Sequence, residues 1–306
     1  MDDDQRRYLA ECAFSEIFIE NPRVQQAQNV MAQLCERSLN DAVVEKPCAA
    51  LIGPSQSGKT STIRSFVERK NTVQAIEGHQ IPVLHVVIGS SITRKGLLQD
   101  ALLAMEQFDI AVMAKSGTES LLLHRLCEAL RALKVQLLVI DECHHLKRGS
   151  DGRYAADVGE MLKSILLRGA CSILLAGVGE EAEAPFTYNE QLALRALKRL
   201  DFSPLKPQDP REHDIFQNFV VDLLMELADR EIIDNAETLA TKENLFAFHQ
   251  ASAGVIGRVS RILQHAIDHM IDRRDTGLSL EDLIQGTDVI QQHSATRAHN
   301  PFRVQA

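Results

Sequence analysis

An eight-residue motif limits what this chain can fold into more than any other feature of its sequence. Residues 53–60 read Gly-Pro-Ser-Gln-Ser-Gly-Lys-Thr and match G-x-x-x-x-G-K-[ST], the pattern of a phosphate-binding loop, or P-loop. The glycines allow backbone N–H groups to curl around an anion, and a helix that begins at Gly58 adds its positive end. An apolar run at residues 49–52 precedes the motif and a helical pattern follows it at 61–69. This strand–loop–helix context predicts a site for nucleotide phosphates.

A second motif lies at residues 137–142, where the apolar run Leu-Leu-Val-Ile ends in Asp141 and Glu142. An apolar strand that ends in two carboxylates is the Walker B pattern. Asp141 is expected to bind Mg²⁺ through water together with the Thr60 hydroxyl, and Glu142 to polarise the attacking water. Lys59 is expected to reach the β- and γ-phosphates of ATP. The residues expected to bind nucleotide are Gly53, Pro54, Ser55, Gln56, Ser57, Gly58, Lys59, Thr60, Ser61 and Asp141.

Short apolar runs alternate with helical patterns through the middle of the chain. The runs lie at residues 48–52, 82–88, 136–140 and 172–176, with a weaker fifth at 200–202. The helical patterns lie at 59–69, 96–105, 119–133 and 154–167. Uninterrupted apolar runs are typical of strands that are buried on both faces of a parallel sheet. The alternation therefore predicts an α/β fold in which helices flank a parallel sheet.

Three prolines between residues 204 and 210 mark the expected end of this α/β core, because proline interrupts both strands and helices. Beyond them only helical patterns occur, at residues 212–228, 242–252, 256–273 and 280–290. We therefore expect a helical N-terminal extension at 1–45, the α/β core at 46–205, a small helical domain at 206–290 and a polar tail at 291–306. The composition of the tail is compatible both with disorder and with docking on a partner.

The composition excludes several other classes of protein. No stretch approaches the roughly 18 uncharged apolar residues of a membrane span. Met1 is followed by three aspartates, the wrong charge for the start of a signal peptide. The six cysteines are scattered without a Cys-x-x-Cys pair, which suits a reducing compartment better than a disulfide framework or a zinc site. We therefore expect a cytoplasmic protein that has no membrane partner.

The segment Asp-Glu-Cys-His-His at residues 141–145 permits two other interpretations. It contains the D-E-x-H box of helicases, but those enzymes need two tandem RecA-like domains, and only about 100 residues with helical patterns follow the proline-rich linker. Cys143, His144 and His145 also offer metal ligands. Adjacent residues rarely converge on one ion, and the sequence has no second cluster of Cys and His to complete a site. The sequence therefore favours packing and hydrogen bonding for these three side chains.

These motifs together resemble an AAA+ ATPase, and more specifically the TniB/TnsC group of transposition regulators, which are related to the phage MuB protein. The resemblance extends over roughly residues 15–290. It is carried by residues 53–61, 139–146, 174–182, 189–195 and 252–262. It implies a P-loop AAA+ sheet followed by a helical lid domain, with ATP held between neighbouring subunits.

The resemblance also implies roles for three arginines. Arg195 matches best the finger that reaches the phosphates bound by the next subunit, with Arg199 as the second candidate. Arg258, at the start of a lid helix, matches sensor 2, which couples the lid to the γ-phosphate. The sequence departs from AAA+ proteins at sensor 1, where Asn or Thr usually ends the strand. Residues 177–179 read Gly-Val-Gly instead, which suggests slow hydrolysis used as a switch.

Proteins like these form nucleotide-dependent rings or filaments around double-stranded DNA and contact its phosphates, with little sequence specificity. The net charge of −9, from 33 basic and 42 acidic residues, argues against a broad basic DNA-binding surface. We therefore expect a few loop cations per subunit to bind DNA, and their repetition in an assembly to supply the affinity. The candidate residues are Arg94, Lys95, Lys115, Lys147 and Arg148.

The leading hypothesis is an ATP- and Mg²⁺-dependent regulator that assembles on DNA, selects a target and recruits or activates a transposase. A target-selector protein is a further candidate partner. An AAA+ helicase loader or signalling ATPase is the nearest alternative. A small-molecule P-loop kinase and a nucleotide-independent scaffold are alternatives from other classes. The helical C-terminal domain disfavours the kinase, and the intact residues Lys59, Thr60, Asp141 and Glu142 disfavour the scaffold.

Overall fold

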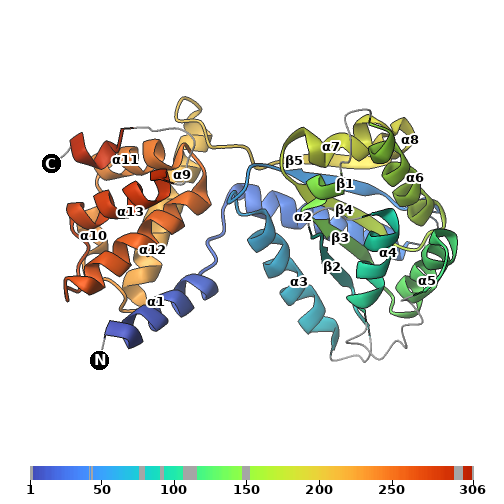
Figure 1. The fold of residues 1–306 in the computed structure, drawn as a ribbon, viewed down its shortest axis with the longest axis horizontal. Helices are drawn as coiled ribbons and strands as arrows, with labels where there is room; N and C mark the ends of the chain where they lie inside the picture. The colour runs from blue at the N-terminus through green and yellow to red at the C-terminus, as the bar shows by residue number, and fades with distance from the viewer. Residues whose placement is uncertain are drawn as a thin grey trace. The chain divides into compact units, whose positions relative to one another are not determined.

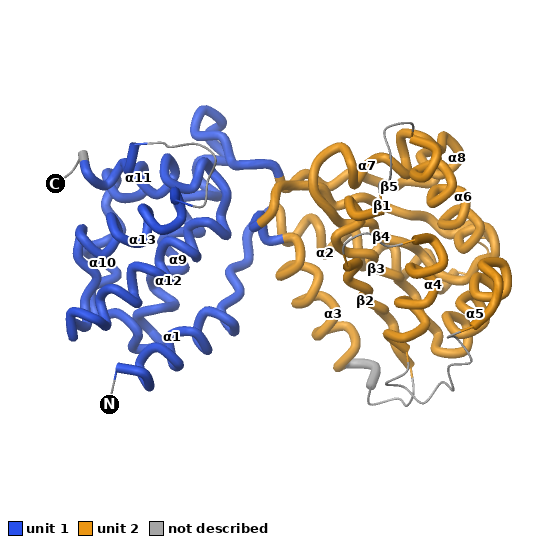
Figure 2. The backbone as a smooth tube through the Cα atoms, viewed as in Figure 1, with its two compact units in different colours: residues 1–22, 56–58, 203–306 blue, residues 23–55, 59–202 orange. Residues whose placement is uncertain are grey.

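The structure is a computed structural model of the chain. It describes residues 3–40, 42, 44–75, 80–89, 93–105, 116–146, 152–292 and 299–304. The chain forms two compact units (Figure 2). A sheet unit contains residues 23–55 and 59–202, and a helical unit contains residues 1–22, 56–58 and 203–306.

Within the described residues, the sheet unit contains one five-stranded parallel sheet with the strand order β2-β3-β4-β1-β5. The strands are β1 (Cys48–Ile52), β2 (Val83–Val87), β3 (Leu137–Asp141), β4 (Ser172–Gly177) and β5 (Ala196–Asp201). Every residue of β1, β3 and β4 is buried, as expected for the inner strands of a parallel sheet. The fold class predicted from the apolar runs is confirmed.

Side chains from alternate strand positions enter two separate hydrophobic cores, one on each face of the sheet. In β3, Leu138 and Ile140 belong to one core, and Leu137 and Val139 belong to the other. Helices α2 (Pro22–Leu39) and α3 (Lys59–Ala75) cover one face. Helices α4 (Arg94–Leu103), α5 (Glu119–Ala132) and α6 (Arg153–Leu167) cover the other face (Figure 1). The sheet unit is therefore a three-layer α/β/α structure.

Two parts of the sheet unit differ from the sequence prediction. Strand β5 begins at Ala196, four residues before the predicted run, because an edge strand with exposed positions has no continuous apolar sequence. Helices α7 (Gly179–Thr187) and α8 (Glu190–Ala193) give no clear helical pattern, since both are short and α7 contains Pro185. A short 3₁₀ helix, η3 (Cys143–Leu146), follows β3.

The helical unit is built around α12 (Ile256–Asp272), whose buried face includes Val259, Ile262, Leu263, Ala266 and Met270. Its other helices are α1 (Asp3–Glu16), α9 (Pro210–Asp229), α10 (Ala236–Leu239), α11 (Lys242–Ser252), α13 (Leu280–Gln292) and the 3₁₀ helix η4 (Pro301–Val304). The N-terminal segment is divided between the units, because α1 packs in the helical unit and most of α2 in the sheet unit. The domain boundaries at residues 45, 205 and 290 stay predictions.

The described end of the C-terminal tail packs against the helical unit. The Phe302 ring is fully buried and meets the Phe248 ring edge-on, with 5.0 Å between the ring centroids. The side-chain amide of Asn300 donates hydrogen bonds to the Ile284 carbonyl at 2.9 Å and to Asp288 at 2.7 Å. Phe302 is therefore part of this core, and Asn300 anchors the tail beside it, although the composition of the tail also allowed disorder.

No helix among the described residues combines the length and the hydrophobicity that crossing a lipid bilayer requires.

The packing of the tail gives a first prediction. Replacing Phe302 by Ala removes a fully buried aromatic ring, and we expect the free energy of unfolding of the helical unit to fall by about 3–5 kcal/mol. Arg303→Ala is the matched control, since it removes only a half-exposed ion pair with Asp288 and is expected to cost less than about 1 kcal/mol. Urea denaturation followed by circular dichroism measures both values. Equal stability of the two variants would contradict the assignment of the tail to the core.

Candidate nucleotide-binding site

The sheet brings together the two motifs that the sequence places 82 residues apart. The P-loop follows β1, and Asp141 ends β3, with β4 lying between these two parallel strands. The Thr60 hydroxyl donates a hydrogen bond of 2.9 Å to Oδ2 of Asp141. The two residues expected to hold Mg²⁺ are thus in direct contact, at the edge where α/β sheets bind their ligands.

Asp141 is a fully buried carboxylate with three hydrogen-bonding neighbours. Thr60 and His85 face Oδ2, with Nε2 of His85 at 3.4 Å, and the Glu142 amide donates to Oδ1 at 2.9 Å. Burial alone would raise the pKa of Asp141, but the hydrogen bonds from His85, Thr60 and the Glu142 amide outweigh that effect and lower the pKa. The carboxylate is therefore ionised near neutral pH and suited to bind a hydrated cation.

His85 is a site residue that the sequence analysis missed. It lies in β2, in the middle of an otherwise apolar run, and its side chain is 14% exposed. A single titratable residue in a buried strand was the available signal. Sequence alone did not indicate its partner, because only the pairing of β2 with β3 places His85 beside Asp141.

Lys59 is held against its own loop. Its ammonium group donates hydrogen bonds to the carbonyl oxygens of Gly53 at 2.9 Å and of Pro54 at 2.7 Å. Burial lowers the pKa of Lys59, whereas the nearby Glu142 and Asp141 carboxylates act in the opposite direction. A nearly buried cation next to a loop of backbone amides is an arrangement that can bind a phosphate group.

Residues 56–58 of the P-loop belong to the helical unit, and within that unit they contact the start of α12. Gly58 has a φ of +90°, a left-handed conformation that favours glycine. The Gly257 amide donates a hydrogen bond of 2.9 Å to the Gln56 carbonyl. The neighbouring Arg258 is partly buried and donates to the Ser252 carbonyl at 3.4 Å. The candidate sensor 2 residue therefore follows a glycine that binds the P-loop.

Glu142 begins a sharp turn after β3. Its φ is +59°, in the left-handed region that is uncommon for a residue with a side chain. Its carboxylate is 34% exposed, and Oε2 lies 3.2 Å from Nδ1 of His144. Burial, followed by the neighbouring His145, lowers the pKa of His144. The candidate catalytic base is thus accessible to solvent and adjacent to an imidazole.

Atoms of η3 and α7 occupy the space beside Gly177, where a sensor 1 side chain is expected. A Cβ atom at Gly177, the last residue of β4, would lie 2.8 Å from Cβ of Ala182, 3.0 Å from Sγ of Cys143 and 3.1 Å from the backbone N of His144. These separations are shorter than van der Waals contact. The missing polar side chain therefore has a steric reason, since η3 and α7 approach the strand too closely to admit one.

Both finger candidates make ion pairs within the chain. Arg195 precedes β5, and its guanidinium contacts Glu45 at 2.7 Å with 17% of its side chain exposed. Arg199 lies in β5 and contacts Glu183 at 2.6 Å, but 60% of its side chain is exposed. Arg199 is therefore the more accessible of the two candidates.

The candidate DNA-binding cations are only partly described. Arg94 pairs with Glu119 at 3.3 Å and with Asp157 at 3.6 Å, whereas Lys95 is exposed. Lys115, Lys147 and Arg148 lie outside the described residues. A DNA-binding role for these five residues stays a prediction.

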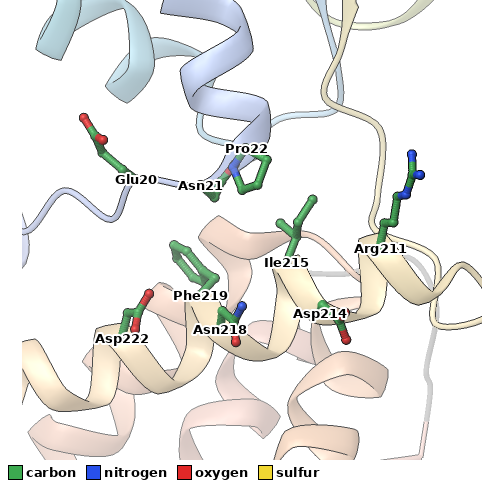
Figure 3. A pocket seen from close by; sticks show the side chains of 9 residues that line it. All are labelled: Glu20, Asn21, Pro22, Arg211, Asp214, Ile215, Asn218, Phe219 and Asp222. Carbon is green, nitrogen blue, oxygen red and sulfur yellow. The ribbon is translucent and has the colours of Figure 1, made fainter.

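A pocket of about 400 Å³ lies in the helical unit (Figure 3). Ile215 and Phe219 project from α9 toward Pro22, and Asp214 and Asp222 lie on the same helix. This pocket contains none of the P-loop or β3 residues and has no set of side chains that resembles a catalytic site.

Comparisons with known proteins identify the family and the fold of the chain. The profile of the family described as "Bacterial TniB protein" matches residues 13–201, more than half of the chain. No curated protein sequence gives a significant match.

Solved structures with a similar fold include the Aeropyrum pernix ORC2 protein in ADPNP–ADP complexes (TM-score 0.67, 15% identity, covering 93% of this chain and 72% of that one). They also include Cdc6p from Pyrobaculum aerophilum (TM-score 0.64, 13% identity, covering 92% and 71%). Drosophila ORC bound to DNA is a third example (TM-score 0.60, 15% identity, covering 93% and 66%). These likenesses confirm the predicted P-loop AAA+ fold with C-terminal helices.

The packing around Gly177 gives a second prediction. Gly177→Asn introduces the residue type that sensor 1 usually has, and we expect it to destabilise the sheet unit by about 1–3 kcal/mol, because its Cβ collides with Ala182 and η3. Gly89→Asn is the matched control, since no atom lies within 4 Å of a Cβ at that position. Thermal unfolding compares the two variants. Faster ATP hydrolysis by Gly177→Asn at unchanged stability would show that the site has room for a sensor.

Proposed function

Because this chain belongs to the TniB family, we propose that it is an ATP-dependent regulator of transposition that assembles on double-stranded DNA. In this role it marks a target and recruits or activates a transposase, with a target-selector protein as a second proposed partner. The observation that carries the proposal is the 2.9 Å hydrogen bond from Thr60 to Asp141, which joins the P-loop to the carboxylate end of β3. The similar fold of an ORC2 protein in ADPNP–ADP complexes and of an ORC bound to DNA supports a nucleotide- and DNA-dependent activity.

The P-loop residues 53–61 would hold the phosphates of ATP. Lys59 is already positioned at the loop by the Gly53 and Pro54 carbonyls, and it would transfer its hydrogen bonds to phosphate oxygens. The exchange replaces two neutral acceptors by charged ones. It favours nucleotides with β- and γ-phosphates over nucleosides.

Thr60 and Asp141 fit a magnesium ion, since a hydroxyl and an ionised carboxylate are the oxygen ligands that this cation prefers. Mg²⁺ bound there would neutralise charge on the β- and γ-phosphates. His85 contributes by keeping Asp141 ionised and in a fixed orientation. His85 is therefore a positioning residue in this proposal.

Glu142 would orient and polarise the water that attacks the γ-phosphate, because its carboxylate is exposed one residue beyond the magnesium ligand. Gly177 leaves the end of β4 without a polar side chain, so one of the groups that usually align the attacking water is absent. We infer that hydrolysis is slow and acts as a switch that ends the ATP-bound state.

Two arginines would couple nucleotide to assembly. Arg258 follows Gly257, whose amide donates a hydrogen bond to the Gln56 carbonyl at the start of α12. Binding or loss of the γ-phosphate at the P-loop would therefore alter a contact of α12. Arg195 or Arg199 from a neighbouring subunit would stabilise charge on the transferred phosphoryl group. ATP would then favour association of subunits, because its site is complete only between two of them.

DNA binding would depend on that association. A chain with a net charge of −9 has few cations to offer, and each subunit would contribute Arg94, Lys95 and the cations at 115, 147 and 148. Many subunits along one duplex would make the binding multivalent. A helicase loader or signalling ATPase is the alternative, and it would form a closed complex with a protein partner instead of a continuous assembly on DNA.

Assembly is the most direct test of the proposed function. With a slowly hydrolysed ATP analogue and non-specific duplex DNA, we expect the protein to form rings or filaments visible by negative-stain electron microscopy. The Lys59→Ala variant should lose nucleotide binding and fail to assemble. Glu142→Gln should bind ATP and give assemblies that persist longer, because hydrolysis no longer ends the bound state. Only monomers in the wild-type sample with ATP and DNA would refute the proposal.

The finger arginine can be identified by complementation. Either Arg195→Ala or Arg199→Ala should lower the ATP hydrolysis rate by about 10³-fold while leaving ATP binding intact. Mixing that variant with Glu142→Gln, which binds ATP and assembles, should restore part of the activity. A site with an intact P-loop and an intact Glu142 then faces a subunit with an intact finger. The other arginine variant serves as the matched control. If mixing restores nothing, the arginine acts within its own subunit or only in stability.

A further inference from the structure

The turn that follows β3 brings together three side chains that commonly bind metals. One ligand atom each from Glu142, His144 and His145 lies within 4.8 Å of the other two. All three side chains are partly buried, so they are neither freely solvated nor sealed from solvent. The sequence argued against a metal at residues 143–145, because adjacent residues usually point in different directions.

The geometry of η3 explains why these residues converge. The left-handed conformation of Glu142 reverses the chain directly after the strand, with a φ of +59°. The His145 amide then donates a hydrogen bond of 3.0 Å to the Glu142 carbonyl, which closes a turn of the 3₁₀ type. In such a turn the side chains of residues i and i+3 eclipse one another, so Glu142 and His145 lie on the same side. The rings of His144 and His145 are 4.1 Å apart at their centroids.

The spacing of the ligand atoms is that of a compact metal site. Nδ1 of His144 lies 3.2 Å from Oε2 of Glu142. Two ligands of a tetrahedral Zn²⁺ ion with bonds of about 2.0 Å are separated by about 3.3 Å. The ligand atoms of the remaining pairs lie within 4.8 Å of one another.

A second observation points to a ligand at the same place. Nδ1 of His144 is buried and makes no hydrogen bond of acceptable geometry among the described residues, although Oε2 of Glu142 lies 3.2 Å away. Buried polar atoms in folded proteins nearly always have a partner, and a metal ion is one of the partners that can supply the missing bond. Cys143 is excluded as a ligand, because it is fully buried and its thiol donates to the Ala182 carbonyl at 3.6 Å.

We propose that Glu142, His144 and His145 form a binding site for a divalent transition-metal ion of the Zn²⁺ class, distinct from the Mg²⁺ site of Thr60 and Asp141. Two imidazoles and one carboxylate suit Zn²⁺, whereas Mg²⁺ prefers oxygen ligands. Three protein ligands leave a fourth position open for water. A metal held there occupies the Glu142 carboxylate and inhibits ATP hydrolysis. The inhibition rests on the proposed function of Glu142, but the metal site itself does not.

The metal site can be tested without nucleotide. Isothermal titration of the full, untagged chain with Zn²⁺ should show one site per chain, and Co²⁺ should give the intense visible absorption of a tetrahedral complex. His145→Gln and His144→Gln should each weaken Zn²⁺ binding at this site at least tenfold, since each removes one of three ligands. His213→Gln is the matched control, because His213 lies in α9 next to Asp214 and is expected to leave the affinity unchanged.

Circular dichroism of each variant establishes that it is folded before the affinities are compared. Equal Zn²⁺ affinity of the wild type and both folded histidine variants would overturn the metal site. So would a Co²⁺ spectrum typical of six oxygen ligands.

The inhibitory effect needs a separate measurement. ATP hydrolysis by the wild type should fall at least tenfold when Zn²⁺ saturates the site in the presence of excess Mg²⁺, and binding of a fluorescent ATP analogue should be retained. In the His145→Gln variant the same Zn²⁺ concentration should inhibit much less. Unchanged hydrolysis at saturation would overturn the inhibition while the titration upheld the site. If the protein hydrolysed no ATP under any condition, the proposed function would fail, and the titration would still decide the metal site.

Discussion

The rest of the site depends on one buried carboxylate. Asp141 has no exposed surface and stays ionised because Thr60, His85 and the Glu142 amide surround it with hydrogen bonds. A buried charge is tolerated only where its neighbours satisfy it, and each of these neighbours comes from a different place in the chain. Thr60 lies in the first turn of α3, His85 lies in β2, and Glu142 begins the turn after β3. The order of the strands therefore brings together the neighbours that stabilise the Asp141 carboxylate.

The turn after β3 also affects the end of β4, where Gly177 lies. Because Glu142 reverses the chain and η3 folds back toward the sheet, the backbone of His144 comes within contact distance of Gly177. That close approach removes the space for a sensor 1 side chain. The same turn also holds Glu142, His144 and His145, whose ligand atoms lie within 4.8 Å of one another. For the proposed function, the missing aligning group at the end of β4 and the proposed metal ligands beside Glu142 both favour a switch, in which a long-lived ATP-bound state matters more than rapid turnover.

Much of the fold could be predicted from the sequence because its signals are local. The P-loop needs particular residue types at fixed spacing, and strands β1 to β4 appear as short apolar runs, interrupted in β2 by His85. The prediction was weaker for β5, which is an edge strand with exposed positions, and for α7, which contains Pro185. The contact of Phe302 with Phe248 could not be predicted from the sequence, since nothing in the polar tail indicates which helices it packs against.

The sequence by itself determined which residue types the candidate phosphate site contains, because Lys59, Thr60, Asp141 and Glu142 are recognisable from their spacing and from the apolar runs before them. Only the tertiary structure decided which side chains face one another. It placed His85 beside Asp141 through the pairing of β2 with β3, and Gly257 against Gln56. It also turned three neighbouring residues after β3 toward a single point. The physical reason is that residue type fixes what a group can bind, whereas long-range pairing and backbone turns fix the distances at which it does so.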